Sequence, residues 1–241
     1  NQASAITTAG IQALSTDQLP AIETRDLAVL TTGQIAALTT KQVNALTTDQ
    51  VVALGTNQVS AITTAGIQAM STDQIAVLET RDLAVLKTTQ IQALTTVQIS
   101  TGLTTTQVQA LTSSELAALT TTQIKSGLTT DQVVALGTNQ VTAFTTAQVQ
   151  AFTTDQIQAL ETRDLVVLTT GQIAALTTSQ VNALTTDQIV ALGTNQASAI
   201  TTAGIQALST DQMQEMETRD LAVLTTGQIA ALTTKQVKAV P

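Results

Sequence analysis

Residues 31–54 read TTGQIAAL TTKQVNAL TTDQVVAL, three nearly identical octapeptides in succession. From Thr7 to Val240 the chain divides into 29 consecutive repeats of this kind. All of them are octapeptides except two nonamers, at 95–103 (TTVQISTGL) and 120–128 (TTTQIKSGL). A segment this short cannot bury an apolar face alone, so a fixed short period indicates a stacked array.

A longer period runs above the octapeptides. The repeat ETRDLAVL, or once ETRDLVVL, begins at residues 23, 79, 161 and 217, with spacings of 56, 82 and 56 residues. Fifty-six residues are seven octapeptides, so we identify a 56-residue superrepeat. Residues 1–6 (NQASAI) recur as the end of GTNQASAI at 193–200. We therefore expect 1–241 to be a single continuous repeat array and a segment of a longer chain.

The apolar positions of the repeat favour a helix over a strand. Position 5 is Ile, Val, Leu or Met in every repeat except at Ala197, and the last position is always a large apolar residue. Positions 5 and 8 share one face of a helix, whereas a strand would place them on opposite faces of a sheet. Ala, Leu and Gln, which are common after position 3, also favour helix.

One continuous helix would not keep that apolar face toward a partner. Eight residues at about 100° each turn the stripe by roughly 80° per repeat, so the helix must end within every repeat. The Thr-Thr pair is the expected boundary, because Thr hydroxyls cap helix N-termini. Position 2, always Thr or Ser, is the favoured cap; the alternative is position 1, with Gln at position 4 closing a capping box. Gly at position 1, and Gly102 and Gly127 in the nonamers, are expected in left-handed turns.

The sequence therefore predicts an all-α fold, an α-solenoid or superhelix of very short helices with one helix per octapeptide repeat. Such helices are too short to be stable alone and must stack. A β-solenoid is the alternative, since Thr, Ile and Val also favour strands and an even period preserves strand register.

Charge is concentrated in the four ETRD repeats, which we call the acidic repeats. Two carboxylates beside an Arg make a poor calcium cage, and acids in a first helical turn are typical of a solvated helix start. We expect the acidic repeats to be cap variants with their charges on a solvated face. A further possibility is that they make contacts between superhelical turns or between chains. The candidate residues are Glu23, Arg25, Asp26, Glu79, Arg81, Asp82, Glu161, Arg163, Asp164, Glu217, Arg219 and Asp220.

Composition argues against catalysis and against several partners. The 241 residues include no His or Cys, so an ordinary general base, a thiolate and a zinc site are missing. We expect no enzyme activity, cofactor, metal or small-molecule substrate. A net charge of −8 disfavours nucleic acid. No apolar run approaches the ~18 residues of a membrane span.

At the level of LTTxQ[IV]xAL, as in LTTGQIAALTTKQVNALTTDQVVAL, nearly the whole chain resembles the repeat regions of very large bacterial secreted or cell-surface proteins of the adhesin-like exoprotein class. The resemblance implies an extracellular or cell-surface location and a role in a stalk, fibre or filament. We therefore expect a non-catalytic structural protein that associates with itself into a fibre or longer array. The alternative is a solenoid binding module that recognises peptide, glycan or ice through its repeated surface.

Overall fold

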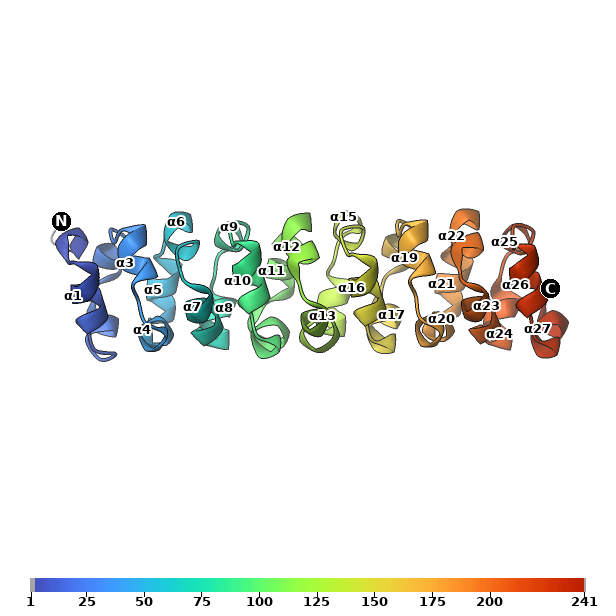
Figure 1. The fold of residues 1–241 in the computed structure, drawn as a ribbon, viewed down its shortest axis with the longest axis horizontal. Helices are drawn as coiled ribbons and strands as arrows, with labels where there is room; N and C mark the ends of the chain where they lie inside the picture. The colour runs from blue at the N-terminus through green and yellow to red at the C-terminus, as the bar shows by residue number, and fades with distance from the viewer. Residues whose placement is uncertain (1–2, 241) are drawn as a thin grey trace. The chain divides into compact units, whose positions relative to one another are not determined.

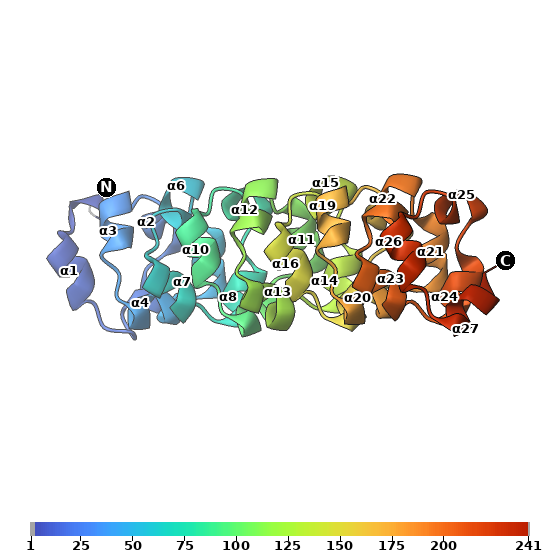
Figure 2. The same ribbon diagram turned by 45° about the vertical axis from the view of Figure 1, so that its right-hand side comes forward.

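The computed structural model describes residues 3–240, and the chain forms two compact parts. We call the part ending at Leu128 the N-terminal array and the part beginning at Thr129 the C-terminal array. Residues 3–240 contain short helices and no β-strand, which confirms the α-solenoid prediction and rules out the β-solenoid. Figures 1 and 2 show these helices from two directions.

The helices of the N-terminal array are η1 (Ala3–Ala5), α1 (Thr8–Ala13), η2 (Leu19–Ala21), α2 (Thr24–Leu27), α3 (Thr32–Ala36), α4 (Thr40–Ala45), α5 (Thr48–Val52), α6 (Thr56–Val59), α7 (Thr64–Ala69), α8 (Thr72–Ala76), α9 (Thr80–Leu83), α10 (Thr88–Ala93), η3 (Gln98–Gly102), α11 (Thr105–Ala110), α12 (Ser113–Ala118) and α13 (Thr121–Gly127).

The helices of the C-terminal array are α14 (Thr130–Val134), α15 (Thr138–Val141), α16 (Thr146–Ala151), α17 (Thr154–Ala159), α18 (Thr162–Leu165), α19 (Thr170–Ala174), α20 (Thr178–Ala183), α21 (Thr186–Ala191), α22 (Thr194–Ala199), α23 (Thr202–Ala207), α24 (Thr210–Glu215), α25 (Thr218–Leu221), α26 (Thr226–Ala231) and α27 (Thr234–Ala239).

Each α-helix begins at position 2 of its repeat, and position 1 is its N-cap residue. In α4, the Gln42 N–H donates to Thr39 Oγ1 at 3.3 Å, and Gln42 Oε1 accepts from the Thr39 N–H at 2.8 Å. This reciprocal pair is a capping box. The preference for position 2 as the cap was therefore wrong, and the alternative register is the correct one.

The six-residue helices end where position 8 turns into an extended conformation, whereas the shorter α-helices end at position 5 or 6. Leu46, at φ −59° and ψ 137°, donates its N–H to Val43 O at 3.2 Å and starts the link to the next repeat. The expected left-handed glycines do not occur, since no residue in the described range 3–240 has a positive φ. Gly55 at position 1 has φ −84° and ψ 161°, an ordinary extended cap conformation.

The two nonamers absorb their extra residue by widening the last helical turn. Leu103 N–H bonds to Gln98 O at 2.9 Å, and Leu128 N–H bonds to Gln123 O at 3.0 Å, so both bonds span five residues. Gly102 is needed for close approach rather than for its dihedral freedom. A Cβ there would lie 3.1 Å from Ile75 Cβ in α8.

The core of each array is built from positions 5 and 8. Val43 is 1% exposed and Leu46 is 4% exposed, and the same two positions are buried through most of both arrays. Phe144 and Phe152, at position 8 of consecutive repeats, pack edge to face with ring centroids 5.1 Å apart. Burial of aliphatic side chains stabilises each helix against its neighbours, as the period of the apolar positions predicts.

Stacking within each array follows a fixed rule. Each helix packs against the helix three repeats later, as α3 does with α6 and α6 with α9, and Figure 1 shows these three in succession along one edge. In the C-terminal array α19, α22 and α25 are arranged in the same way. The Gln at position 4 reaches back four repeats, as described below. One superhelical turn therefore contains between three and four repeats.

The closest helix pairs need glycine at position 4. Gly66 in α7 faces α4, and a Cβ there would lie 2.8 Å from Ile62 Cγ2 and 3.3 Å from Val43 Cγ2. Asn44 Nδ2 in α4 donates across the same contact to Ala69 O at 2.8 Å. The C-terminal array repeats this arrangement with Gly204 and an Asn182-to-Ala207 hydrogen bond.

Candidate functional site

Position 4 is the chemically distinctive position of the repeat. Its Gln is buried throughout most of both arrays, although the residue before it is exposed. Gln42 Nε2 donates to Ile11 O at 2.7 Å and to Leu14 O at 2.8 Å, at the C-terminal end of the helix four repeats earlier. Gln180 makes the same pair of bonds to Val149 O and Phe152 O. One amide thus joins the start of one helix to the end of another.

The side chain at position 1 can vary because the Gln side chain accepts a hydrogen bond from the backbone N–H of position 1, whatever side chain that residue carries. Gln58 Oε1 accepts from the Gly55 N–H at 2.9 Å, and Gln90 Oε1 accepts from the Lys87 N–H at 2.8 Å. The Gln therefore satisfies a helix-start N–H and the position 8 carbonyl, and it gives a second hydrogen bond to the position 5 carbonyl, which already accepts from the position 8 N–H. The sequence indicated this Gln only as the closing residue of an alternative capping box and did not reveal a partner four repeats away.

The acidic repeats replace this Gln with Asp. Asp82, Asp164 and Asp220 are each 1% exposed, and neither carboxylate oxygen has a hydrogen-bond partner. Burial raises the pKa of each Asp, and the neighbouring Arg opposes part of that rise. These side chains are therefore not the solvated helix-start acids expected from the sequence.

The Glu and Arg of each acidic repeat lie nearer to solvent. Arg81 Nε pairs with Glu79 Oε2 and approaches Asp82 Oδ1 at 3.9 Å. Corresponding pairs join Arg163 with Glu161 and Arg219 with Glu217. The Arg side chains in these three repeats are 58–65% exposed. Exposed pairs of this kind contribute little to stability.

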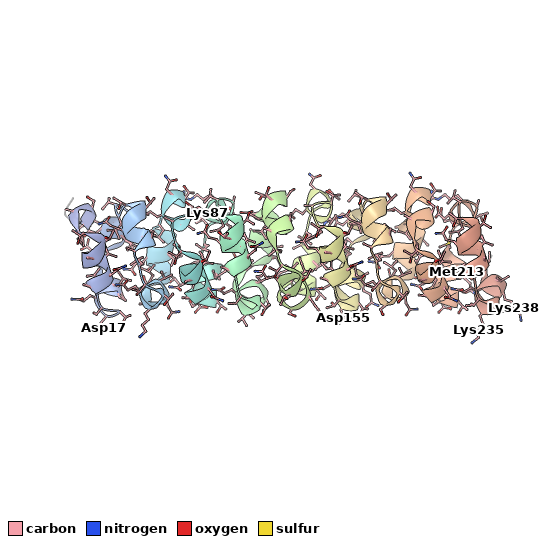
Figure 3. The ribbon with its side chains drawn as sticks, viewed as in Figure 1. Asp17, Lys87, Asp155, Met213, Lys235 and Lys238 are labelled. Carbon is pink, nitrogen blue, oxygen red and sulfur yellow. The ribbon has the colours of Figure 1, made fainter. Side chains whose placement is uncertain are left out.

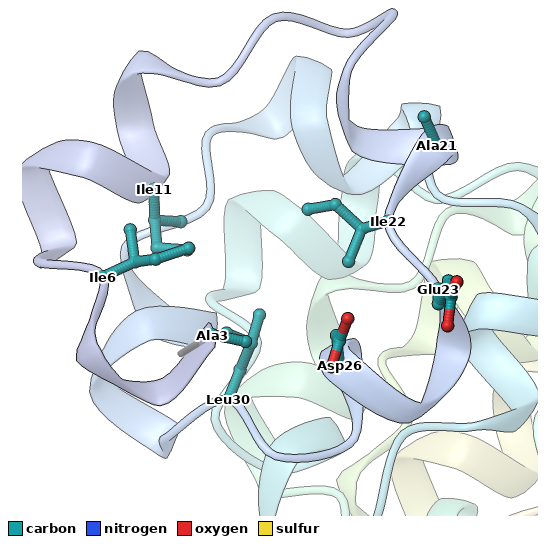
Figure 4. Close-up of a pocket in the computed structure, with 8 residues that line it drawn as sticks. All are labelled: Ala3, Ile6, Ile11, Ala21, Ile22, Glu23, Asp26 and Leu30. Carbon is teal, nitrogen blue, oxygen red and sulfur yellow. The ribbon is translucent and has the colours of Figure 1, made fainter. Parts of the chain in front are cut away.

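The first acidic repeat has a more open setting. Arg25 pairs with Glu23 at 2.6 Å, and Asp26 is half-buried rather than enclosed. Figure 4 shows Glu23 and Asp26 at a cavity of about 560 Å³ that is also lined by Ile6, Ile11 and Ile22. Apolar side chains of the array thus face this cavity, together with the two acids.

Within each array, the acidic repeats pack against repeats of other types. Each packs against the repeat three earlier: α9 against α6, α18 against α15 and α25 against α22, while α2 packs against η1. The three described partners α6, α15 and α22 belong to repeats that begin GTNQ. Each acidic repeat thus lies beside a fixed companion across one superhelical turn. Whether these residues also contact other chains stays a prediction.

A fifth acid replaces Gln at Glu115, which sequence analysis did not single out. Glu115 Oε2 accepts from the Thr112 N–H at 2.7 Å and from Thr112 Oγ1 at 2.9 Å, as a Gln oxygen would. Its Oε1 is buried without a partner beside a cavity of about 290 Å³. Burial raises the pKa of Glu115, and the bonds from Thr112 oppose the rise. The signal in the sequence was an acid at position 4.

The charged side chains outside the acidic repeats are mostly peripheral. Figure 3 shows Lys235 and Lys238 projecting outward from the C-terminal array, whereas Met213 at position 5 lies inside it and is fully buried. Across residues 3–240, no group of three or more His, Cys, Asp or Glu side chains is placed to hold a metal ion. No helix in that range is both long enough and apolar enough to cross a membrane.

Comparison with known proteins identifies the repeat. The family described as the ALTTAQ repeat matches residues 19–56, 51–79, 75–113, 127–162, 157–194 and 213–240. No curated protein matches the chain. Among solved structures, the leucine-rich repeat-containing protein LegL7 from Legionella pneumophila aligns with 90% of this chain and 83% of its own, at 11% identity and a TM-score of 0.24. A TM-score this low carries no argument about fold or function.

Proposed function

Because the chain belongs to the ALTTAQ repeat family, we propose that it is a non-catalytic structural repeat protein, part of a bacterial surface fibre, adhesin stalk or extracellular filament. The observation that carries this proposal is the bond from position 4 to the helix four repeats earlier. Every added repeat with Gln at position 4 can make the same bond, so such an array can grow in length without a change in its local structure. A protein whose task is to span a distance needs that property.

Two further observations support the structural role. The sequence contains no His or Cys, and its nine Lys and Arg residues are dispersed.

The experiment is electron microscopy and light scattering of the full chain over a wide concentration range. We expect elongated particles that join end to end or laterally as concentration rises. Duplicating one 56-residue block should lengthen the single particle by a fixed increment. Particles that stay monomeric at all concentrations would rule out the filament. Particles whose length does not change after the duplication would rule out a role in which the array spans a distance.

Location is tested separately in the cells that make the protein. Antibodies against the array should label intact cells, and brief protease treatment of intact cells should remove that label. Labelling that requires cell lysis would contradict a surface or extracellular role.

A further inference from the structure

Three buried aspartates interrupt the bonding rule of the array. Asp82, Asp164 and Asp220 occupy the position of a Gln whose amide would donate to two main-chain carbonyls. A carboxylate accepts hydrogen bonds but cannot donate one unless it is protonated. The bond that joins repeats four apart is therefore lost at three places with the same local sequence.

The register of neighbouring repeats identifies the carbonyls opposite Asp82. Gln74 donates to Val43 O and Leu46 O, and Gln90 donates to Val59 O and Ile62 O. The acceptors thus lie 31 and 28 residues earlier on both sides of Asp82. The same offset places Val51 O and Leu54 O opposite the Asp82 carboxylate.

Both aspartates of the C-terminal array obey the same register. Gln212 donates to Val181 O and Leu184 O, and Gln228 to Ala197 O and Ile200 O, so the same offset assigns Ile189 O and Leu192 O to Asp220. The offset of the Gln172 bonds assigns Val133 O and Leu136 O to Asp164.

The shorter side chain leaves a gap of useful size. Asp lacks one methylene of Gln, so its oxygens stop about 1.5 Å short of the amide nitrogen. Gln nitrogens reach the position 8 carbonyls at 2.7–2.8 Å near Asp82, so the corresponding oxygen–oxygen gap is roughly 4–4.5 Å. A cation with ligand distances of about 2.3–2.6 Å bridges two oxygens at such a separation.

A glycine accompanies each of these aspartates. Gly55, Gly137 and Gly193 directly follow Leu54, Leu136 and Leu192, and no other repeat has Gly at position 1. A Cβ on these glycines would meet its nearest neighbour at 3.7–3.9 Å, and their φ values are negative. Neither backbone strain nor steric contact therefore requires glycine. Glycine at this position keeps side-chain atoms away from the two main-chain carbonyls that the register assigns to the carboxylate.

The neighbouring charges leave part of each carboxylate available. The Arg approaches one oxygen of each Asp, at 3.6–3.9 Å, and is already paired with its Glu. The GTNQ repeats that pack alongside carry no charged residue, and Asp49 in the preceding TTDQ repeat is exposed. By the register of the repeats, the buried carboxylate thus has carbonyl oxygens on one side. On its other side is the Arg guanidinium, which is already paired with the Glu of the same repeat.

We propose that each junction between an acidic repeat and the TTDQ–GTNQ pair before it binds a hard divalent cation, with Ca²⁺ as the best fit. The Asp carboxylate and the two main-chain carbonyls supply the protein ligands at Asp82, Asp164 and Asp220, and water completes the shell. Hard cations prefer such oxygen ligands, and Ca²⁺ tolerates irregular geometry better than Mg²⁺ does. The cation replaces the missing amide as the link between repeats four apart.

Calorimetric titration and thermal unfolding of the full chain test this proposal. After removal of metal with EDTA and dialysis at pH 7, CaCl₂ should bind at about three sites and raise Tm by several degrees. MgCl₂ should raise Tm less, and NaCl of equal ionic strength should leave it unchanged. A Tm that depends on ionic strength alone would overturn the proposal.

The matched variants separate the sites from general charge effects. The triple variant Asp82→Gln, Asp164→Gln, Asp220→Gln restores the hydrogen bonds from the position 4 amide to the main-chain carbonyls. Its Tm in EDTA should therefore be higher than that of the wild type and should not change when Ca²⁺ is added. The control variant Asp49→Asn, Asp131→Asn, Asp187→Asn removes three acids from position 3 and should keep the Ca²⁺ response. A Ca²⁺ response that survives the first variant, or disappears in the second, would contradict the assignment. A wild-type Tm that varies with pH but ignores Ca²⁺ would show protonated aspartates instead and would also overturn it.

Discussion

At the scale of single residues, position 4 determines how the repeats are joined. Its Gln accepts from a helix-start N–H and donates to two helix-end carbonyls four repeats earlier, as Gln42 does with Thr39, Ile11 and Leu14. Each of these groups would be costly to bury unpaired. The effect of substitution at position 4 should therefore far exceed that at the exposed position 6.

The first prediction concerns Gln180→Ala. This substitution removes the donors to Val149 O and Phe152 O and the acceptor for the Thr177 N–H. We expect the free energy of unfolding to fall by about 2–4 kcal/mol, since buried groups lose their partners. Gln206→Ala, at exposed position 6 of α23, is the control and should change it by less than about 0.5 kcal/mol. Urea unfolding of the two variants measures the difference, and equal losses would contradict this role of position 4.

The second prediction concerns Glu115→Gln and pH. Burial raises the pKa of Glu115 above its ordinary value of 4.5, so the folded state binds the proton more tightly than the unfolded state. The stability linked to this group is complete below pH 4.5 and is lost as pH rises through the folded pKa. Glu115→Gln should therefore stabilise the protein by about 1–3 kcal/mol at pH 8 and by little at pH 4.

Thermal unfolding of the Glu115→Gln variant at both pH values measures that effect. The control is Glu215→Gln, which changes an exposed acid in α24. A gain of stability equal at pH 4 and pH 8 would show that ionisation of Glu115 is not its source.

At the scale of helices, the sequence predicted the type of element but not its boundary. The spacing of positions 5 and 8 indicated a helix in each repeat, and the burial of Val43 and Leu46 confirms which face is inside. The constant hydroxyl at position 2 suggested the cap there, yet position 1 is the cap. Gly55 and Lys87 are tolerated at position 1 because Gln Oε1 binds their backbone N–H. Because this hydrogen bond uses the backbone N–H of position 1, the side chain there is free to vary. The sequence therefore does not mark position 1 as the cap.

Contacts between helices were less accessible to sequence analysis. The expected left-handed role of glycine was wrong, because Gly55 at position 1 has a negative φ and Gly102 is required by the approach of Ile75 from three repeats earlier. The acidic side chains were expected near solvent, whereas Asp82 is buried. Its burial depends on how successive repeats stack into a superhelix, which the sequence of a single octapeptide does not determine. The residues were visible in the sequence, but their neighbours three and four repeats away were not.

The third prediction is a pair of opposite effects of Gly→Ala. A Cβ at Gly204 would lie 2.7 Å from Ile200 Cγ2 and 3.3 Å from Val181 Cγ2, so Gly204→Ala should destabilise the protein by about 1–3 kcal/mol. A Cβ at Gly171 in α19 meets nothing nearer than 3.9 Å, so Gly171→Ala should stabilise it by about 0.4–1 kcal/mol. Denaturant unfolding distinguishes the two signs. A Gly204→Ala variant as stable as the wild type would contradict the packing at α20 and α23, and destabilisation by Gly171→Ala would contradict the open setting of Gly171.

At the scale of the whole molecule, the superrepeat matches the superhelix within each array. Contacts three repeats apart and bonds four repeats apart place between three and four repeats in a turn, so seven octapeptides make about two turns. Acidic repeats 56 residues apart in one array, at 23 and 79 or at 161 and 217, therefore recur after about two turns. This relation gives the 56-residue period a structural meaning.

The fourth prediction concerns the number of repeats. Five consecutive repeats are the fewest that include one complete bond between repeats four apart, so peptides of four repeats or fewer should remain unfolded. Longer peptides should gain free energy of unfolding with each repeat, as nearest-neighbour arrays do. Circular dichroism of peptides with four, eight and sixteen repeats measures this trend. A four-repeat peptide with a full helical spectrum would contradict it.

The central claim, that a buried Gln at position 4 joins repeats four apart, is tested most directly by hydrogen exchange of Gln side-chain amides in ¹⁵N nuclear magnetic resonance spectra. Two populations should be seen: slowly exchanging amides from position 4, such as Gln42 and Gln180, and rapidly exchanging amides from exposed position 6, such as Gln206. Gln180→Ala should remove one slow signal, and Gln206→Ala one fast signal. A single population that exchanges at the rate of exposed amides would contradict the claim.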